Sequence, residues 1–445
     1  MKLTLLDLLE ATGGGEVGGT QVAERFATYH TDSREVQPGG LFFALRGAEM
    51  DGHQFVPDAI TRGAAAVVVD RKLEAPTGIV EIVVPDTWKA LYDVAALVLA
   101  RVKPLVVGIT GSNGKTSTKE MTAAVLATKF EVLRNTGNLN TETGVPLTIL
   151  RLEPNHQALV LEMGLQRAGD IERLASLARP SIGVITNIGT VHMEFFEKQE
   201  DLARAKGELV TGLPPDGHAV LNADDRYFGM LSAMSTAPVT SFGIEGGDFR
   251  VSGYKPAADG GCQFTVRGTH VELAMTGRHQ ALNAAATLAA GEAAGVPLDE
   301  GASALRTVAV DHRLQEFTTR AGFVVVDDAY NASPESMLAA FAAMTERPHD
   351  GRLLAVLGHM GELGDAAGDA HRHVGEAAAR TFDEVAVVDT PLGRLLAEAA
   401  KAEIVPDNRA AVAWVRAHAR EGDRVLVKAS HSRHLEEVVK ELTAA

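Results

Sequence analysis

The segment 106–121, "VVGITGSNGKTSTKEM", constrains the fold of this chain more than any other, because an apolar strand runs through a glycine-rich loop into a helix. A Walker A loop has the pattern Gly-x-x-x-x-Gly-Lys-Ser/Thr. Ile109 stands where the first Gly of that pattern belongs, while Gly108 lies too early and Gly111 too late. The order of strand, loop and helix still predicts a phosphate-binding turn, in a shortened form.

The residue types of this loop suit a nucleotide phosphate better than an ordinary strand-to-helix turn. Gly111 and Gly114 let the backbone turn tightly and point N–H groups inward, where the helix N-terminus adds positive potential. The ammonium of Lys115 can reach the β- and γ-phosphates, and the hydroxyl of Thr116 can bind Mg²⁺. The predicted ATP-binding residues of the loop are Gly111, Ser112, Asn113, Gly114, Lys115, Thr116 and Ser117.

Composition excludes several classes of protein. The 445 residues are 46% hydrophobic and 22% charged, as expected of a globular chain. A formal net charge of -16 argues against a general nucleic-acid binder but permits anionic substrates at a locally positive site. A single cysteine, Cys262, excludes an intramolecular disulfide, and its strand-like neighbours predict a small buried residue. With no apolar stretch of membrane-spanning length and no signal-peptide pattern, we expect a cytoplasmic protein.

The alternation of apolar runs and turn residues predicts an α/β protein of three domains. Residues 1–103 mix short strands with glycine-rich turns and predict a small mixed α/β N-terminal domain. Residues 104–310 hold the phosphate loop and further strands that alternate with helices, which predicts a central P-loop domain with a mainly parallel sheet. In residues 311–445, five apolar strands alternate with helices and predict a Rossmann-like C-terminal domain.

Polar residues follow two strands of the predicted central domain. Glu162 ends "ALVLE", and His192 lies just beyond "SIGVIT". Lys206 and Glu208 lie on the helix that comes next. Taken singly, a strand-end acid is usually solvated, a lone histidine is usually structural, and a helix lysine usually lies on the surface. Together they gather where parallel strands end, which is where α/β proteins bind ligands.

In this order, the segments "TGSNGKTSTKE", "LEMG", "TNIGTVHMEFF" and "ARAKGEL" resemble the Mur ligase family over almost the whole chain. Members of that family add amino acids to the UDP-linked peptidoglycan precursor, and their ATP loop is the shortened TGxxGK[ST]. The resemblance implies ATP and two Mg²⁺ ions as cofactors, with Lys115, His192 and Lys206 catalytic. Thr116 and Glu162 would hold one ion. His192 and Lys206 would hold the other, and Lys206 would be carbamylated because an ammonium group cannot ligate a cation.

The segments "DDAYNASPESM", "VLGHMGELG" and "AHRHVG" resemble the branch of the family that adds D-alanyl-D-alanine. This resemblance implies an ATP-dependent ligase. The terminal carboxylate of UDP-N-acetylmuramoyl-tripeptide would attack the γ-phosphate of ATP, and an acyl phosphate would form. The amine of D-Ala-D-Ala would then displace phosphate and form the amide. We expect these small-molecule partners, no nucleic acid and a monomer.

The resemblance also implies contacts outside the phosphate loop. Asn283, Arg313 and Asp328 would bind ATP. The substrate-binding residues would be Ser33, Arg34, Asn138, Asn140, Thr141, Tyr330, Asn331, Ser333 and Lys428.

Two positions depart from the family pattern. His359 stands where an Asp is frequent, and His431 stands where an Arg is frequent. The sequence therefore leaves open which cation holds the carboxylate of the dipeptide, with Lys428 and Arg433 nearby.

Other functions were weighed against this one. The nearest rivals are a diaminopimelate- or lysine-adding ligase and a folylpolyglutamate synthase, and "YNASPESM" argues against both. A P-loop kinase or a small NTPase would need neither the first nor the third domain. A non-enzymatic paralogue would not need the set Lys115, Thr116, Glu162, His192 and Lys206. The sequence does not tell whether the third residue of the peptide is diaminopimelate or lysine.

Overall fold

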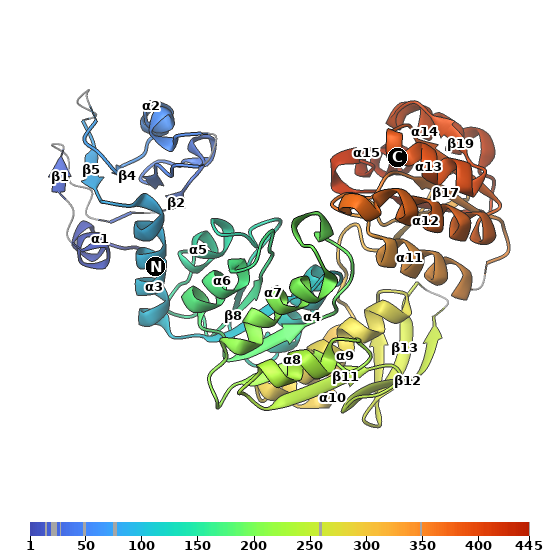
Figure 1. Cartoon of the computed structure of the whole chain (residues 1–445), viewed down its shortest axis with the longest axis horizontal. Coiled ribbons are helices and arrows are strands. Elements are labelled where there is room, and N and C mark those ends of the chain that lie inside the picture. Colours follow the sequence, from blue (N-terminus) through green and yellow to red (C-terminus); the bar gives the residue numbers. More distant parts are fainter. Residues whose placement is uncertain are drawn as a thin grey trace. The chain divides into compact units, whose positions relative to one another are not determined.

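The computed structural model describes residues 1–13, 16–18, 25–26, 28–47, 50–73, 78–257, 260–347 and 349–444 (Figure 1). The chain divides into two compact units. The first unit comprises Met1–Gly108, Phe130–Gly164 and Glu172–Pro180, and the second comprises Ile109–Lys129, Leu165–Ile171 and Ser181–Ala445. Strand β6 (Leu105–Thr110) and helix α6 (Asp170–Ala178) contain residues of both units.

The first unit contains a five-stranded sheet in the order β1-β5-β4-β3-β2, in which only the β1–β5 pair is antiparallel. All residues of β4 are buried, which accounts for the apolar run "AVVV". The elements wholly within this unit are α1 (Leu5–Thr12), β1 (Glu16–Gly18), β2 (Tyr29–His30), η1 (Ser33–Glu35), β3 (Leu41–Phe43), η2 (Gly52–Phe55), α2 (Val56–Thr61), β4 (Ala66–Val69), β5 (Val80–Val83), α3 (Thr87–Val102), β7 (Val132–Arg134), α5 (Gly144–Ile149) and β8 (Ala158–Glu162).

Helix α3 shows why local sequence predicted its bounds. The Asp86 side chain accepts hydrogen bonds from the backbone N–H groups of Trp88 and Lys89 and so caps the first turn. Lys103, in the left-handed conformation with φ 53°, ends the helix before Pro104. The helix spans the whole apolar-periodic segment "TWKALYDVAALVLARV" between these two signals.

The central part of the second unit holds strands β9 to β14 in sequential order, with β9 to β12 parallel. Its strands and helices are α4 (Lys115–Leu126), β9 (Ile182–Ile185), η3 (Met193–Phe195), α7 (Gln199–Thr211), β10 (His218–Asn222), α8 (Phe228–Met234), β11 (Val239–Gly243), β12 (Phe249–Pro256), β13 (Cys262–Val266), β14 (Thr269–Leu273), α9 (Arg278–Ala293) and α10 (Leu298–Leu305).

Strands β12, β13 and β14 pair antiparallel, a departure from the mainly parallel pattern that we expected. The turn between β13 and β14 is Arg267–Gly268, with φ of 49° and 83°. Positive φ at both central residues is the geometry of a tight hairpin, so the local sequence reverses the chain directly. Cys262 is buried in β13, as expected, and burial raises the pKa of its thiol to about 12.

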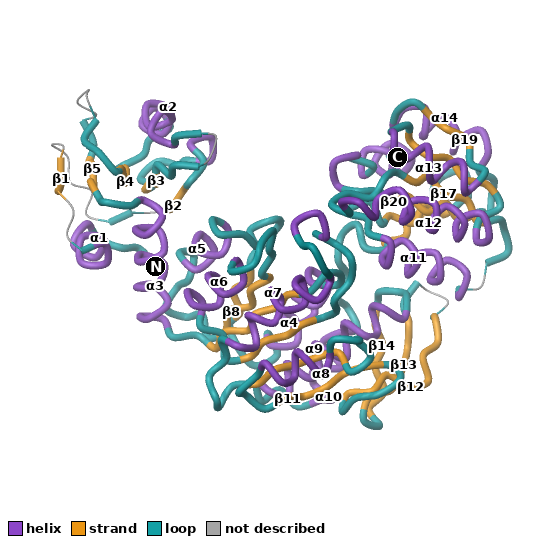
Figure 2. Tube along the Cα trace, viewed as in Figure 1, coloured by secondary structure: helices purple, strands orange, loops and turns teal. Residues whose placement is uncertain are grey.

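The C-terminal part of the second unit is a six-stranded sheet in the order β15-β16-β20-β17-β18-β19, parallel except for the β15–β16 pair (Figure 2). Helices α11 to α13 pack on one face and helices α14 and α15 on the other. The elements are β15 (Gln315–Thr318), β16 (Val324–Asp327), α11 (Pro334–Glu346), β17 (Leu353–Leu357), η4 (Gly364–Ala366), α12 (Ala367–Thr381), β18 (Glu384–Val388), α13 (Pro391–Ala400), β19 (Glu403–Val405), α14 (Asn408–His418), β20 (Arg424–Lys428), η5 (His431–Arg433) and α15 (Glu436–Thr443).

The five apolar strands expected after residue 311 are confirmed as β16 to β20. No helix in the described part of the chain is both long enough and apolar enough to cross a lipid bilayer.

The core beneath α11 gives a stability prediction. Phe341 packs edge-to-face on Phe382, with ring centroids 5.0 Å apart, and both side chains are buried. Phe341→Ala should lower the free energy of unfolding of this layer by about 3–5 kcal/mol, because a large aromatic ring leaves a cavity. Hydrogen exchange of the β17 amides measures the loss. Ile404→Ala, at a side chain that is 46% exposed, should change exchange little.

Candidate active site

The phosphate loop depends on two glycines that no other residue can replace without distortion. Gly111 has φ 146° and Gly114 has φ 83°. A Cβ atom on Gly111 would lie 1.9 Å from Thr186 Oγ1, and one on Gly114 would lie 2.4 Å from Asn283 Oδ1. The loop is therefore packed against neighbouring side chains at both turning points.

The turn after β9 fixes the loop from one side. Ser112 N donates to the carbonyl of Asn187 at 2.8 Å, and Asn113 N donates to Asn187 Oδ1 at 3.0 Å. The Asn187 amide and the Thr186 hydroxyl both donate to the carbonyl of Asn113, at 2.9 and 2.6 Å. Ser112 is buried and Thr116 lies in the first turn of α4, as does buried Ser117. The loop is thus pre-formed, with its backbone held by side chains from another strand end.

Two lysines meet at one carbonyl. The Lys115 ammonium donates to the carbonyls of Gly111 and Ser112 at 2.8 and 3.1 Å. The Lys206 ammonium, on α7, donates to the same Gly111 carbonyl at 3.1 Å, and this residue is 1% exposed. Burial, and then the charge of Lys115, holds the pKa of Lys206 well below its usual range. The predicted catalytic lysines therefore lie together, and the surroundings of Lys206 disfavour its charged form.

His192 lies beside Glu362. The two atoms His192 Nδ1 and Glu362 Oε2 are 2.6 Å apart, and the pair is an ion contact rather than an aligned hydrogen bond. Both residues adopt the left-handed conformation, with φ of 70° and 60°. The His192 ring holds the pKa of the Glu362 carboxyl below its usual range. With Nδ1 facing a carboxylate, the other ring nitrogen, Nε2, is the one suited to a metal ion.

In the first unit, Glu162 is held by two asparagines. Asn140 Nδ2 donates to Glu162 Oε1 at 2.9 Å. Asn135 pairs with the backbone of Glu162, donating to its carbonyl and accepting from its N–H, both at 2.9 Å. The predicted substrate residue Asn138 is exposed in the same loop, and Thr141 Oγ1 lies 3.3 Å from Thr143 Oγ1. Glu162 is thereby presented at the end of β8 in one fixed position.

Ser33 and Arg34 lie in the short helix η1. Ser33 is buried, whereas the Arg34 side chain is 80% exposed. Asp32 caps the helix by accepting from Arg34 N at 2.9 Å and also binds the Arg34 guanidinium, with Nη2 and Oδ2 2.6 Å apart. The guanidinium is accessible to an anionic ligand, although such a ligand would compete with Asp32.

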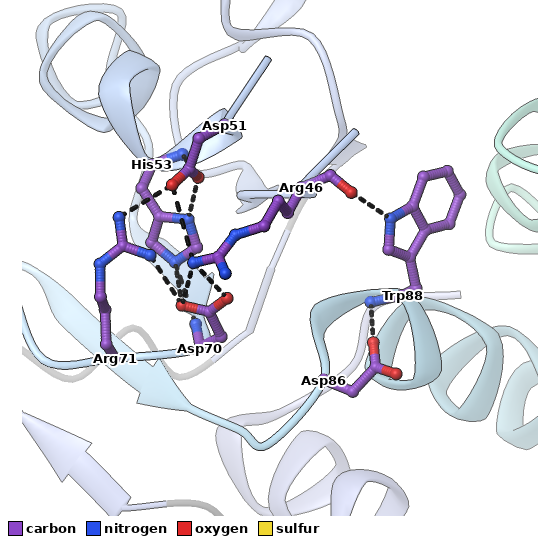
Figure 3. A network of polar contacts seen from close by, with 7 residues as sticks. All are labelled: Arg46, Asp51, His53, Asp70, Arg71, Asp86 and Trp88. Carbon is purple, nitrogen blue, oxygen red and sulfur yellow. Dashed lines mark hydrogen bonds and ion pairs between the residues drawn. The ribbon is translucent and has the colours of Figure 1, made fainter. Parts of the chain in front are cut away.

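Near these residues in the sequence, a polar network surrounds buried His53 (Figure 3). His53 Nδ1 lies 2.6 Å from Asp51 Oδ1, and His53 Nε2 accepts from Asp70 N at 3.0 Å. Arg71 binds both aspartates, at 2.9 Å each, and Arg46 lies 3.1 Å from Asp70. Hydrogen bonds from the backbone of His53 and from Arg71 hold the pKa of Asp51 well below its usual range. The network fixes the turn from Asp51 to His53.

The predicted C-terminal site residues form a second cluster in the second unit. Lys428 is buried, and its ammonium contacts Asp328 Oδ2 at 2.6 Å and the carbonyl of Asn331 at 2.9 Å. The Arg313 guanidinium lies over the Tyr330 ring, 4.4 Å from its centroid. Lys428 therefore acts on this cluster by holding Asp328 and the Asn331 segment in place.

Helix α11 brings a further residue to the phosphate loop. Ser333 caps this helix and its hydroxyl donates to Asn113 Oδ1 at 2.9 Å. Glu335, in the first turn, accepts at Oε1 from the backbone N–H and the hydroxyl of Thr190, both at 2.9 Å. Within the second unit, the C-terminal sheet thus contacts the loop through Ser333 and the neighbouring turn through Glu335.

The donor set suits a magnesium–nucleotide site. Among the described residues, no group of three or more His, Cys, Asp and Glu side chains is arranged to hold a metal ion. Mg²⁺ in nucleotide sites is typically held by one or two carboxylates together with phosphate oxygens, so a larger protein cage is not required. In the second unit, Thr116 and His192 offer hydroxyl and imidazole groups of the kind such a site uses. The Glu162 carboxylate, in the first unit, is a group of the same kind.

Three family models match the chain. They are "Mur ligase family, catalytic domain" over residues 26–102, "Mur ligase middle domain" over 109–291 and "Mur ligase, glutamate ligase domain" over 312–431. The chain belongs to the Mur ligase family. Its three-domain α/β fold is therefore the fold expected from the sequence, while the predicted domain boundaries stay predictions.

Individual Mur ligases are similar along the whole chain. UDP-N-acetylmuramoyl-tripeptide–D-alanyl-D-alanine ligase of Bacillus subtilis (strain 168) is 36% identical over 425 residues, covering 93% of this chain and 92% of its own. A crystal structure of MurF from Acinetobacter baumannii matches with a TM-score of 0.91 and 29% identity, covering 100% of this chain and 99% of its own. MurF ligase of Thermotoga maritima, solved in complex with ADP, matches with a TM-score of 0.85 and 30% identity, covering 94% and 97%.

Four residues that the sequence did not assign position the predicted Mur ligase residues. Thr186 supports the phosphate loop and Asn135 holds Glu162, while Glu335 and Glu362 contact Thr190 and His192. Of these four residues, only Glu335 had a sequence signal, because it follows the Ser333-Pro334 pattern that marks the start of a helix. The others act on partners far away in the chain. The individual site roles stay predictions.

The tight packing of the loop gives a test. Gly111→Ala should weaken ATP binding at least about tenfold, because φ 146° and the contact with Thr186 exclude a side chain. Isothermal titration with ATP and Mg²⁺ measures the loss. Gly229→Ala is the matched control, because nothing lies within 4 Å of the added Cβ. Equal ATP affinity in both variants would contradict the packing argument.

Proposed function

We propose that the chain is an ATP-dependent ligase that joins D-alanyl-D-alanine to the terminal carboxylate of UDP-N-acetylmuramoyl-tripeptide. The observation that carries the proposal is the shortened phosphate loop with Lys115 and Lys206 on one carbonyl. It occurs in a chain that matches ligases of this activity along almost its whole length. The motif "YNASPESM" separates the proposal from other amide ligases of the superfamily.

The first step brings two anions together, so the protein must neutralise charge and fix positions. The Lys115 ammonium donates to the carbonyls of Gly111 and Ser112 in the phosphate loop. We propose that it exchanges these carbonyls for phosphate oxygens when ATP binds. The N-terminus of α4 adds positive potential, whereas the N–H groups of Ser112 and Asn113, which we expected to point inward, donate to Asn187. The tripeptide carboxylate attacks the γ-phosphorus, ADP leaves, and an acyl phosphate remains.

The second step forms the amide. The dipeptide amine attacks the acyl carbon, phosphate departs with the bonding electron pair, and the amine loses a proton. Tyr330, Asn331 and Ser333 are proposed to position the dipeptide, and Lys428 holds the Asn331 segment. Arg313 and Asp328 are proposed to contact ATP from the same cluster, and Asn283 from beside Gly114. Ser33 and Arg34 are proposed to bind the UDP end, with Asn138, Asn140 and Thr141 along the peptide.

The residues proposed to hold Mg²⁺ are Thr116 and Glu162 for one ion and His192 and Lys206 for a second. When bound, Mg²⁺ supplies positive charge beside the phosphate oxygens. Mg²⁺ prefers oxygen ligands, so Lys206 is proposed to take part as a carbamate and not as an amine. Its neutral amine, favoured by burial, can attack CO₂ at carbon and lose a proton, which forms an N–C bond and a carbamate with oxygen ligands.

An acceptor assay tests the reaction. ATP, Mg²⁺, UDP-tripeptide and D-Ala-D-Ala should release phosphate and yield a product heavier by the dipeptide less water, as read by mass spectrometry. The tripeptide is supplied with either diaminopimelate or lysine at its third position. Phosphate release with a free amino acid but not with the dipeptide would overturn the proposal.

A second test concerns the carbamate. Lys206→Ala should lower kcat by at least roughly a hundredfold, as loss of a group that stabilises transition-state charge does. Added formate or acetate should restore part of the rate by supplying the missing carboxylate oxygens. Lys440→Ala, at an exposed lysine of α15, serves as control. Full activity of Lys206→Ala without added acid would remove the carbamate from the mechanism.

A further inference from the structure

In the C-terminal sheet, the polar side chains of His359 and Arg433 follow the carboxyl ends of two neighbouring strands, β17 and β20. The backbone ties the two strand ends together. Gly358 N donates to the carbonyl of Lys428, and Ser430 N donates to the carbonyl of His359, both at 3.0 Å. Ligands of open α/β sheets bind at such carboxyl ends, so the side chains that follow these two strands are candidates for a binding site.

Two buried nitrogens of these side chains have no hydrogen-bond partner among the described residues. They are Arg433 Nε and His359 Nδ1. Burying a polar group without a partner costs free energy, and native proteins seldom leave such groups unpaired without a reason. Both groups can donate a hydrogen bond, and Arg433 is always charged. A pair of unsatisfied donors next to a fixed positive charge is what an anion requires.

The two side chains belong to one site. Burial lowers the pKa of His359, and the charge of Arg433 lowers it further, as does His371, so the Arg433 charge lies close to the His359 ring. A Cβ atom on Gly358 would lie 3.4 Å from Arg433 Cγ, which places the arginine stem against the residue that precedes His359.

The His359 side is held rigidly. Met360 N donates to His371 Nε2 at 2.9 Å, and His371 Nδ1 lies 2.6 Å from the carbonyl of Ala367. His371 is fully buried. The wall is also closely packed, since a Cβ on Gly358 would come within 2.6 Å of Ala429 Cβ. The two donors are therefore pre-organised, which reduces the cost of binding.

The two neighbouring cationic side chains, Lys428 and Arg313, already have partners within the protein. The ammonium of Lys428 is buried against Asp328 and the carbonyl of Asn331. The guanidinium of Arg313 lies over the Tyr330 ring. The centroid of the His431 ring lies 5.7 Å from that of the Tyr330 ring. His431 precedes Arg433 by two residues in the chain. The segment that carries Arg433 therefore contacts the proposed dipeptide residue Tyr330 through His431.

We propose that Arg433 and His359 bind the terminal carboxylate of the D-Ala-D-Ala acceptor and set its specificity for an acceptor with a free acid end. The inference rests on the proposed function. Nε and one Nη of a guanidinium form a planar fork that matches the two carboxylate oxygens. His359 Nδ1–H would donate to one of these oxygens. Arg433 and His359 would thus select the acceptor by its terminal carboxylate, which is the end of the dipeptide opposite the reacting amine.

The test compares two acceptors, D-Ala-D-Ala and its C-terminal carboxamide, in the full enzyme with ATP, Mg²⁺ and UDP-tripeptide. Wild-type enzyme should prefer the acid. Arg433→Gln should lower kcat/KM for the acid roughly tenfold to a hundredfold, as loss of a charged hydrogen bond does, with little change for the amide. KM for ATP and KM for UDP-tripeptide should stay unchanged in this variant. A general folding defect would alter these two constants as well.

Two further variants complete the experiment. His359→Leu removes the second donor and should also reduce the preference for the acid, so the inference does not depend on one variant folding. Arg416→Gln, at an exposed arginine that contacts Glu441, should keep the wild-type preference. If Arg433→Gln and His359→Leu lower both acceptors equally, or leave the ratio unchanged, the carboxylate is bound elsewhere and the inference is wrong.

The same data separate this inference from the proposed function. If wild-type enzyme transfers no dipeptide at all, the proposed function is wrong and the inference falls with it. If wild-type enzyme uses the dipeptide but its preference for the acid survives both variants, only the inference is wrong.

Discussion

The carbonyl of Gly111 is the atom on which the site depends. It accepts from Lys115 and from Lys206, so two amines that would repel each other as cations share one oxygen. Only a glycine with φ 146° can turn this carbonyl toward both lysines while packing on Thr186. Burial and the charge of Lys115 both lower the pKa of Lys206, which reduces the cost of placing a second amine here. The Gly111 carbonyl therefore positions both lysines in one turn.

Much of the fold followed from local sequence because its causes are local. The capping group Asp86 and the left-handed Lys103 bound α3. The apolar runs of β16 to β20 reflect burial on both faces of a parallel sheet, with helical clusters on each side. The antiparallel hairpin at Arg267–Gly268 was not predicted, although buried residues alternate with less buried ones along β13 and β14 and Gly268 marks the turn. We expected the parallel pattern of the preceding strands to continue.

The sequence predicted the main residues of the candidate site but not the residues that hold them in position. Lys115 and Lys206 were found through a motif and a resemblance. Asn135, Thr186 and Glu362 were not, because a support is defined by its partner and not by its neighbours in the chain. Ser333 reaches Asn113 across 220 residues, and Glu335 reaches Thr190 across 145. No local pattern encodes such distances, so contacts of this kind emerge only when the fold is known.

The loop is held by groups from several distant segments, namely Asn187 after β9, Asn283 in α9 and Ser333 before α11. A nucleotide bound there would be a ligand of the folded second unit rather than of one segment. Ligands that bind only the native state raise its stability by mass action, by about 2.7 kcal/mol at a hundredfold excess over Kd. The cell's own ATP pool would then act as a chemical chaperone for this unit, coupling its lifetime to the energy supply.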